Sequence, residues 1–160
     1  MQQTRAMTVF SASKRSTAVV PFTREDVWSV LSDAGLVAKL TPMVRSIEDQ
    51  GGTWLWKLAP IEVLGKSIGL SFTERMDLRP TERIEFTHTP KGEERAGVEG
   101  TYTLTDQAQG THLAIDLGVH VDLPFPKIAK PAVQTTMQGV IAAMGAGFAH
   151  NLDRHLKSRR

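Results

Sequence analysis

Residues 113–126 read LAIDLGVHVDLPFP, and they decide the fold. Up to Leu123, apolar residues alternate with polar or small ones, and this period of two predicts a strand with one covered face. From about Pro131 to Leu156 the apolar residues recur every three or four positions instead, which predicts one long helix. At about 3.3 Å per strand residue and about 1.5 Å per helix residue, the two elements span roughly 35 Å and 39 Å. We therefore expect the helix to lie along the sheet that this strand completes.

The chain before this strand is expected to form one strand, two short helices and then further strands. Val9–Val20 is the first expected strand. Thr23 can cap a helix whose first turn is acidic, and Leu36 and Leu40 suggest a second short helix. Alternation broken by turn signals then predicts about six antiparallel strands. These are Val44–Gln50, Thr53–Leu58, Ile68–Leu78, Glu82–His88, Val98–Leu104 and Leu113–Leu123.

Length, charge and cysteine content limit the classes of protein that the chain can belong to. Its 160 residues predict a single domain over 1–160, with 1–8 as a loose lead-in and 157–160 as a basic tail. The net charge of +2 and the lack of a basic run with interleaved aromatics argue against nucleic acid. The absence of cysteine excludes disulfides and thiol chemistry. Since no signal peptide or membrane span is recognisable, a cytoplasmic protein is expected, with weak contact between the basic tail and an anionic membrane as an alternative to a solvated tail.

Four short motifs, in this order, carry a resemblance to a known group of proteins. They are PFTREDVWSVLSD (21–33), TPMV (41–44), GTYTL (100–104) and DLPFP (122–126). Together they resemble the SRPBCC superfamily, which includes START lipid-transfer domains, birch-pollen allergen relatives and bacterial polyketide cyclases. The resemblance covers residues 10–156. It implies an α+β helix-grip fold, in which a curved antiparallel sheet wraps around the C-terminal helix and leaves a hydrophobic cavity between them.

Alternation indicates which side chains would line such a cavity. Glu74 shares strand parity with Phe72 and Met76, and a carboxylate on an inner face has to be paired, wet or neutral. His88 follows Phe86 in parity, although a bulge or a place at the rim would turn either polar group away. The two tryptophans suit a covered core as well as a ligand wall. The expected lining residues are Trp54, Trp56, Phe72, Glu74, Met76, Phe86, His88, Tyr102, Leu117, Met137, Ile141, Met144 and Phe148.

The long helix carries glycines at three interior positions: Gly139, Gly145 and Gly147. Each costs about 1 kcal/mol of helix stability relative to alanine. One interpretation is that small residues leave ligand space beneath the helix. The other is that they permit close backbone packing or a bend, and the sequence leaves both open.

No residue pattern predicts a metal, a cofactor or a known catalytic centre. His112 and His120 share the polar face of the last strand with Asp116, but eight residues between the histidines is too far for one small ion. No nucleophile elbow, P-loop or dinucleotide fingerprint occurs. We therefore expect no cofactor and no metal, and the catalytic residues, if there are any, are unknown.

Three functions agree with these features. The first is binding or transport of a small hydrophobic ligand, such as a lipid, an isoprenoid quinone or a polyketide-like molecule. The second is an enzyme of the polyketide cyclase or aromatase type, with Glu74, Tyr102 or His88 handling protons. The third is an interaction module like the co-chaperones of the superfamily, which would expose an apolar patch. The first is preferred, and the chain is expected to be a monomer or a homodimer.

Overall fold

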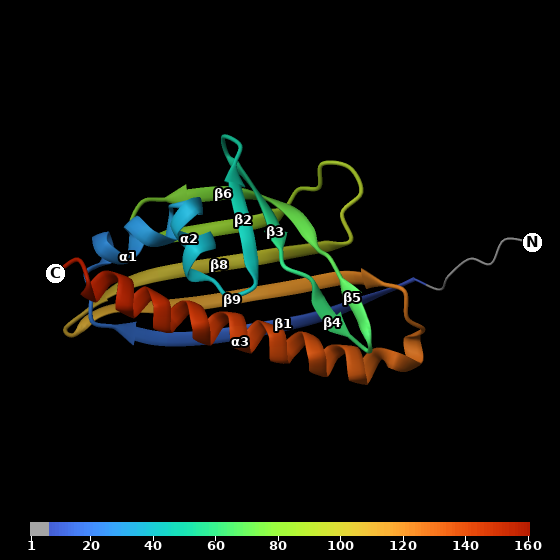
Figure 1. The fold of residues 1–160 in the computed structure, drawn as a ribbon. Helices are drawn as coiled ribbons and strands as arrows, with labels where there is room; N and C mark the ends of the chain where they lie inside the picture. The colour runs from blue at the N-terminus through green and yellow to red at the C-terminus, as the bar shows by residue number, and fades with distance from the viewer. Residues whose placement is uncertain (1–6) are drawn as a thin grey trace, which may run out of the picture.

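The computed structural model describes residues 7–160 and has an α+β helix-grip fold, as expected (Figure 1). A seven-stranded antiparallel sheet forms one layer, and a long C-terminal helix lies along it. In spatial order the strands are β1 (Thr8–Val20), β9 (Gly110–Leu123), β8 (Ala96–Gln107), β7 (Arg83–His88), β6 (Ser71–Arg79), β3 (Thr53–Leu58) and β2 (Val44–Asp49). The lead-in expected at residues 1–8 lies outside the described residues, except that Met7 precedes β1 and Thr8 already belongs to it.

Short polar side chains start both of the short helices. Thr23 caps α1 (Arg24–Leu31), because its side chain accepts a hydrogen bond from the backbone N–H of Asp26 at 3.1 Å. Asp33 caps α2 (Ala34–Leu40) in the same way, by accepting from the N–H of Leu36. Val27, Val30 and Leu31 of α1 are buried and pack on the sheet. The two helices thus cover the end of the sheet that receives the C-terminal half of α3 (Lys130–Lys157) (Figure 1).

The sequence prediction missed one hairpin. Ile68–Leu78, expected as a single strand, is interrupted at Gly69 and Leu70, and only its second part is β6. The first part belongs to β5 (Lys66–Ile68), which pairs with β4 (Ile61–Val63) in a separate two-stranded sheet. The buried Ile61 and Val63 pack with Phe125 and Val133, so the hairpin covers the beginning of α3.

The backbone of α3 approaches the edge strand β1 more closely than any other strand. Gln134 near its beginning donates a hydrogen bond to the carbonyl of Ser11 at 2.9 Å. Asn151 near its end donates to the carbonyl of Leu40, the last residue of α2, at 2.9 Å. Both ends of α3 are therefore fixed to other elements, while its middle faces the sheet.

The apolar core is divided into clusters rather than continuous. One cluster joins α1, the end of α3 and the strand residues Ile84, Phe86 and Leu104. A second joins Phe10, Phe72 and the beginning of α3 at the opposite end. A third consists of α2 residues with Ile47 and Trp54. Between the first two clusters, the apolar side chains of α3 and of the central strands are only half-buried. These are Val98, Ile115, Leu117, Val119, Met137, Val140, Ile141, Met144 and Phe148.

The three glycines of α3 have different surroundings. Gly147 packs against the ring of Pro42, and a Cβ there would overlap it. Gly139 and Gly145 are exposed, and a Cβ at either would meet nothing within 4 Å. Close packing therefore explains Gly147, whereas the other two create no space beneath the helix.

Substituting these glycines should have opposite effects on stability. We expect Gly145→Ala to raise the free energy of unfolding by up to about 1 kcal/mol, because alanine loses less backbone entropy in a helix. Gly147→Ala should give no gain or a loss, since its methyl group meets Pro42. Thermal unfolding of the two variants checks this. Equal stabilisation by both would contradict the packing described here.

The end of the chain folds back on the beginning of the domain. α3 ends at Lys157, so the expected tail begins inside the helix. The guanidinium of Arg160 lies over the ring of Phe22, 4.5 Å from its centroid, and donates to the carbonyl of Pro21. The last residues thus contact the turn between β1 and α1.

Candidate functional site

Strand register places the polar and aromatic candidates on one face of the sheet. Glu74 on β6 lies opposite Trp54 on β3 and opposite His88 on β7. Trp56 is opposite Phe72, and their rings stack with centroids 5.6 Å apart. Phe72 shares a cluster with Val133 of α3, so this face is the one toward α3. Of the expected lining residues, Trp54, Phe72, Glu74 and Phe86 are buried and the other nine are half-buried.

Glu74 is a buried carboxyl group without a counter-charge. Only 2% of the residue is exposed, and it forms no ion pair with any of residues 7–160. Burial raises its pKa from the ordinary 4.5 to about 8, while the nearby indole N–H of Trp56 acts in the opposite, weaker direction. That N–H is itself buried and makes no hydrogen bond of normal geometry. At neutral pH Glu74 is therefore mostly a neutral acid, able to donate a hydrogen bond.

Tyr102 is the second polar group of this face. It lies opposite Ile84, and its ring packs on Phe86 with centroids 5.2 Å apart. Burial raises the pKa of its phenol, and the nearby Glu74 carboxyl raises it further. No hydrogen bond from its hydroxyl to protein is present among residues 7–160. Together with the indole N–H of Trp56, Glu74 and Tyr102 thus bring hydrogen-bond donors to a largely apolar wall.

The helix contributes the facing wall. Met137, Ile141, Met144 and Phe148 lie three or four residues apart and are all half-buried. Leu117 on β9 is half-buried as well. These α3 side chains face the sheet from the helix and keep part of their surface accessible.

His88 belongs to a separate polar cluster. Its Nε2 lies 2.9 Å from Oε1 of Glu94, and its ring lies 5.1 Å from that of His120. Glu94 also accepts from the N–H and the hydroxyl of Thr73, at 2.8 and 2.7 Å. Burial alone would raise the pKa of Glu94, but these hydrogen bonds and one from the N–H of Lys91 together lower it. Because an ionised Glu94 only accepts, Nε2 of His88 carries the proton.

A glycine makes room for this cluster. A Cβ at Gly97 would overlap both His88 and His120. Sequence reasoning did not anticipate Glu94, which lies in a loop where periodicity gives no signal, and it placed His120 on a solvated face. His88 is therefore engaged by Glu94 and His120, whereas Glu74, Tyr102 and the indole N–H of Trp56 remain available on the face toward α3.

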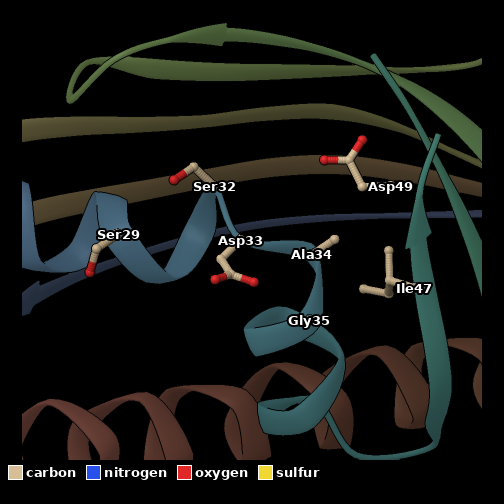
Figure 2. A pocket seen from close by; sticks show the side chains of 7 residues that line it. All are labelled: Ser29, Ser32, Asp33, Ala34, Gly35, Ile47 and Asp49. Carbon is tan, nitrogen blue, oxygen red and sulfur yellow. The ribbon is translucent and has the colours of Figure 1, made fainter. Parts of the chain in front are cut away.

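Two open hollows lie elsewhere on the surface. Figure 2 shows the first, of about 480 Å³, where side chains of α1, the beginning of α2 and β2 meet. The second, of about 530 Å³, lies where the β6–β7 turn and β8 approach Arg24. Neither contains a predicted lining residue. The first is lined by Ser29, Ser32, Asp33, Ala34, Gly35, Ile47 and Asp49, and the second by Arg24, Arg79, Glu82, Arg83, Thr103, Leu104, Thr105 and Asp106.

Neither a metal-binding cluster nor a membrane-spanning helix occurs within residues 7–160. Among residues 7–160, no three histidine, aspartate or glutamate side chains converge in a way that could hold a metal ion. No helix in the same range is both long and apolar enough to cross a membrane.

Comparison with solved structures shows the same fold in distant proteins. The Zhui aromatase/cyclase from Streptomyces sp. R1128 has a TM-score of 0.68 at 16% identity, with 93% of this chain and 95% of that chain covered. A START superfamily protein from Mycobacterium smegmatis has a TM-score of 0.65 at 17% identity, with 94% and 99% covered. A conserved protein from Geobacillus kaustophilus has a TM-score of 0.66 at 18% identity, with 92% and 96% covered.

Comparison with family models assigns the sequence to a protein family. No curated protein sequence matches this chain. The family model described as polyketide cyclase / dehydrase and lipid transport matches residues 11–157, which is nearly the whole chain. The chain therefore belongs to the polyketide cyclase / dehydrase and lipid transport family, a ligand-binding family of the SRPBCC superfamily.

Proposed function

We propose that the chain binds a small hydrophobic ligand between the sheet and α3. The observation that carries this proposal is Glu74, a buried and neutral acid on the same face toward α3 as Tyr102. Burying a carboxyl group costs free energy unless the group is hydrogen-bonded, and a bound ligand would supply that hydrogen bond. The half-buried apolar side chains around it supply the hydrophobic part of the binding energy, at about 25 cal/mol per Å² removed from water.

The two polar groups define the chemistry of the ligand. Both donate hydrogen bonds, so they suit a ligand that accepts at one end and is apolar elsewhere. A carbonyl or quinone oxygen on an isoprenoid, lipid or polyketide-like body meets this description. Met137 and Met144 are unbranched and adapt to irregular ligand shapes.

Removing either donor should weaken binding of such a ligand. With a prenylated benzoquinone as probe, we expect Glu74→Leu and Tyr102→Phe each to raise Kd about tenfold, since each removes one hydrogen bond. Quenching of Trp54 and Trp56 fluorescence measures Kd. Glu85→Leu on the outer face of β7 is the control, because its side chain is exposed.

The pH dependence gives a second readout of the same site. Above about pH 8 the Glu74 carboxyl ionises and ceases to donate, so Kd for the quinone should rise. A Kd that is identical at pH 6 and pH 9 and unaffected by both substitutions would contradict the proposal. Native mass spectrometry of protein purified from its own host then identifies the ligand carried in the cell.

An enzyme of the cyclase or aromatase type is the second candidate. The observation that favours it is again Glu74, because a pKa near 8 allows one carboxyl group both to give and to take a proton close to neutral pH. Glu74→Gln distinguishes the two functions. A carrier keeps most of its affinity, since glutamine still donates, whereas an enzyme loses turnover of a linear polyketone while it still binds the substrate.

A further inference from the structure

Exposed apolar side chains gather at one end of the molecule. Among residues 7–160, six large apolar residues are exposed, and four of them lie at the end where β9 runs into α3. The β1–β9 register pairs Val9 with Asp122 and Thr8 with Leu123, and Met7 directly precedes Thr8. Leu64 at the tip of the β4–β5 hairpin is 49% exposed, and Ile128 in the 3-10 turn η1 (Lys127–Ala129) is 88% exposed. We call Met7, Val9, Leu64 and Ile128 the apolar tip.

The hairpin and the η1 turn are neighbours in space. The ammonium group of Lys66, two residues after Leu64, lies 5.7 Å from the ring centroid of Phe125. Phe125 lies two residues before η1 and shares a core cluster with Ile61 and Val63 of the hairpin. Figure 1 shows β4, β5 and the beginning of α3 together, at the end opposite the C-terminus.

The backbone at Leu64 is unfavourable for leucine. Leu64 has φ of 48° and Gly65 has φ of 79°, so both central residues of this hairpin turn are left-handed. Asparagine, aspartate and glycine are preferred at such positions, and a side chain like leucine costs roughly 1 kcal/mol or more there. The residue is 49% exposed, so burial within the folded chain offsets only part of this cost. An apolar partner outside the chain would explain the residue.

Positive charge surrounds Leu64 and Ile128. Lys66, Lys127 and Lys130 are exposed, and none of them forms an ion pair within residues 7–160. The acidic residues nearest to these lysines along the chain are Glu62, which is exposed, and Asp122, which is half-buried. The apolar tip therefore combines exposed apolar side chains with neighbouring residues whose net charge is positive.

We propose that the apolar tip docks on the surface of an anionic lipid bilayer, with Leu64 and Ile128 inserted and the three lysines at the headgroups. Lysine is depleted in protein–protein interfaces, and protruding single side chains provide no extended complementary surface. Basic residues around a few apolar ones are instead typical of reversible membrane contact. This proposal goes beyond the proposed function. A carrier would exchange its apolar ligand at a membrane, but docking itself needs no ligand.

Vesicle binding by the full chain tests the docking. We expect binding to vesicles of phosphatidylcholine with roughly one third phosphatidylglycerol, and little binding to phosphatidylcholine alone or at high salt. Ile128→Ser should lower the partition coefficient roughly tenfold, and Lys127→Gln about fivefold. Leu64→Asn should also weaken binding while leaving stability unchanged or higher, because asparagine tolerates the left-handed backbone. Co-sedimentation and thermal unfolding measure the two effects.

Matched controls distinguish binding through the apolar tip from non-specific binding by other exposed apolar side chains. Val19→Thr and Leu78→Thr remove exposed apolar side chains, 47% and 40% exposed, away from the tip and should bind like the wild type. Glu74→Leu should bind vesicles normally, so failure of the ligand site and failure of docking are distinguishable. Equal binding to neutral and anionic vesicles, or wild-type binding by both tip variants, would overturn the proposal. So would a wild-type dimer in sedimentation that Ile128→Ser converts to monomer without any vesicle binding.

Discussion

Glu74→Gln should stabilise the protein at alkaline pH, and the gain should disappear in acid. In the unfolded chain this carboxyl group ionises near 4.5, but in the folded protein only near pH 8. Between these values the folded state binds more protons than the unfolded state, so wild-type stability falls as pH rises. The loss is complete above about pH 8, and the difference of pKa sets an upper limit of about 5 kcal/mol. Glutamine has nearly the same shape and no charge to bury.

Urea unfolding of both proteins between pH 4.5 and pH 8.5 measures this difference. The variant should exceed the wild type by several kcal/mol at the upper end and match it at the lower end. Glu85→Gln, on the exposed side of the neighbouring strand, should show no such trend. If Glu74→Gln were equally destabilising at every pH, Glu74 would be ionised and paired, contrary to the structure.

Gly100→Ala should cause a much larger loss of stability than the glycine variants of α3. Gly100 lies in the middle of the sheet, opposite Phe86 on β7 and Leu117 on β9. A Cβ there would overlap the backbone oxygen of Asp116 and lie 2.8 Å from Cα of Leu117. Because these are backbone atoms, no side-chain rotation relieves the overlap, and β8 and β9 have to separate locally. We expect a loss of about 3 kcal/mol.

A neighbouring glycine provides the control for this prediction. Gly118 lies opposite Glu99 on the same pair of strands, and a Cβ there would meet nothing within 4 Å. Gly118→Ala should therefore leave the midpoint of chemical unfolding unchanged or slightly higher. Similar losses for both alanines would mean that the strands at Gly100 lie farther apart than described. If Gly100→Ala is insoluble, Gly100→Ser in the same assay reports the same overlap.

Most of the fold could be predicted from periodicity, because long alternating strands and one striped helix leave few alternatives. Thr53–Leu58 has the predicted bounds, and Thr23 caps α1 as expected. The β4–β5 hairpin was not predictable from alternation, since its strands have three residues each. Elements this short show no period, and the left-handed turn at Leu64 uses a residue that gives no turn signal.

The sequence predicted which strand residues of the candidate site share a sheet face, but not which other residues contact them. Alternation placed Glu74 among apolar residues, and its burial follows from that position. His88 satisfies the same rule, yet Glu94 from the β7–β8 loop and His120 from β9 engage its ring. Such contacts depend on how a loop closes and on the room left by Gly97, and no local pattern encodes them. Which ligand the site takes remains a proposal.

The position of β1 in the sheet has a consequence for folding during synthesis. β1 precedes the other strands of the sheet along the chain, but within residues 7–160 it pairs only with β9, from Thr8 opposite Leu123 to Val20 opposite Thr111. A ribosome therefore has to release about two thirds of the chain before the first strand has a partner. Contacts this distant in sequence slow folding, so closure of the sheet is a late step. Until then β1 and the residues that α3 will cover are exposed together, which makes the nascent chain a substrate for chaperones.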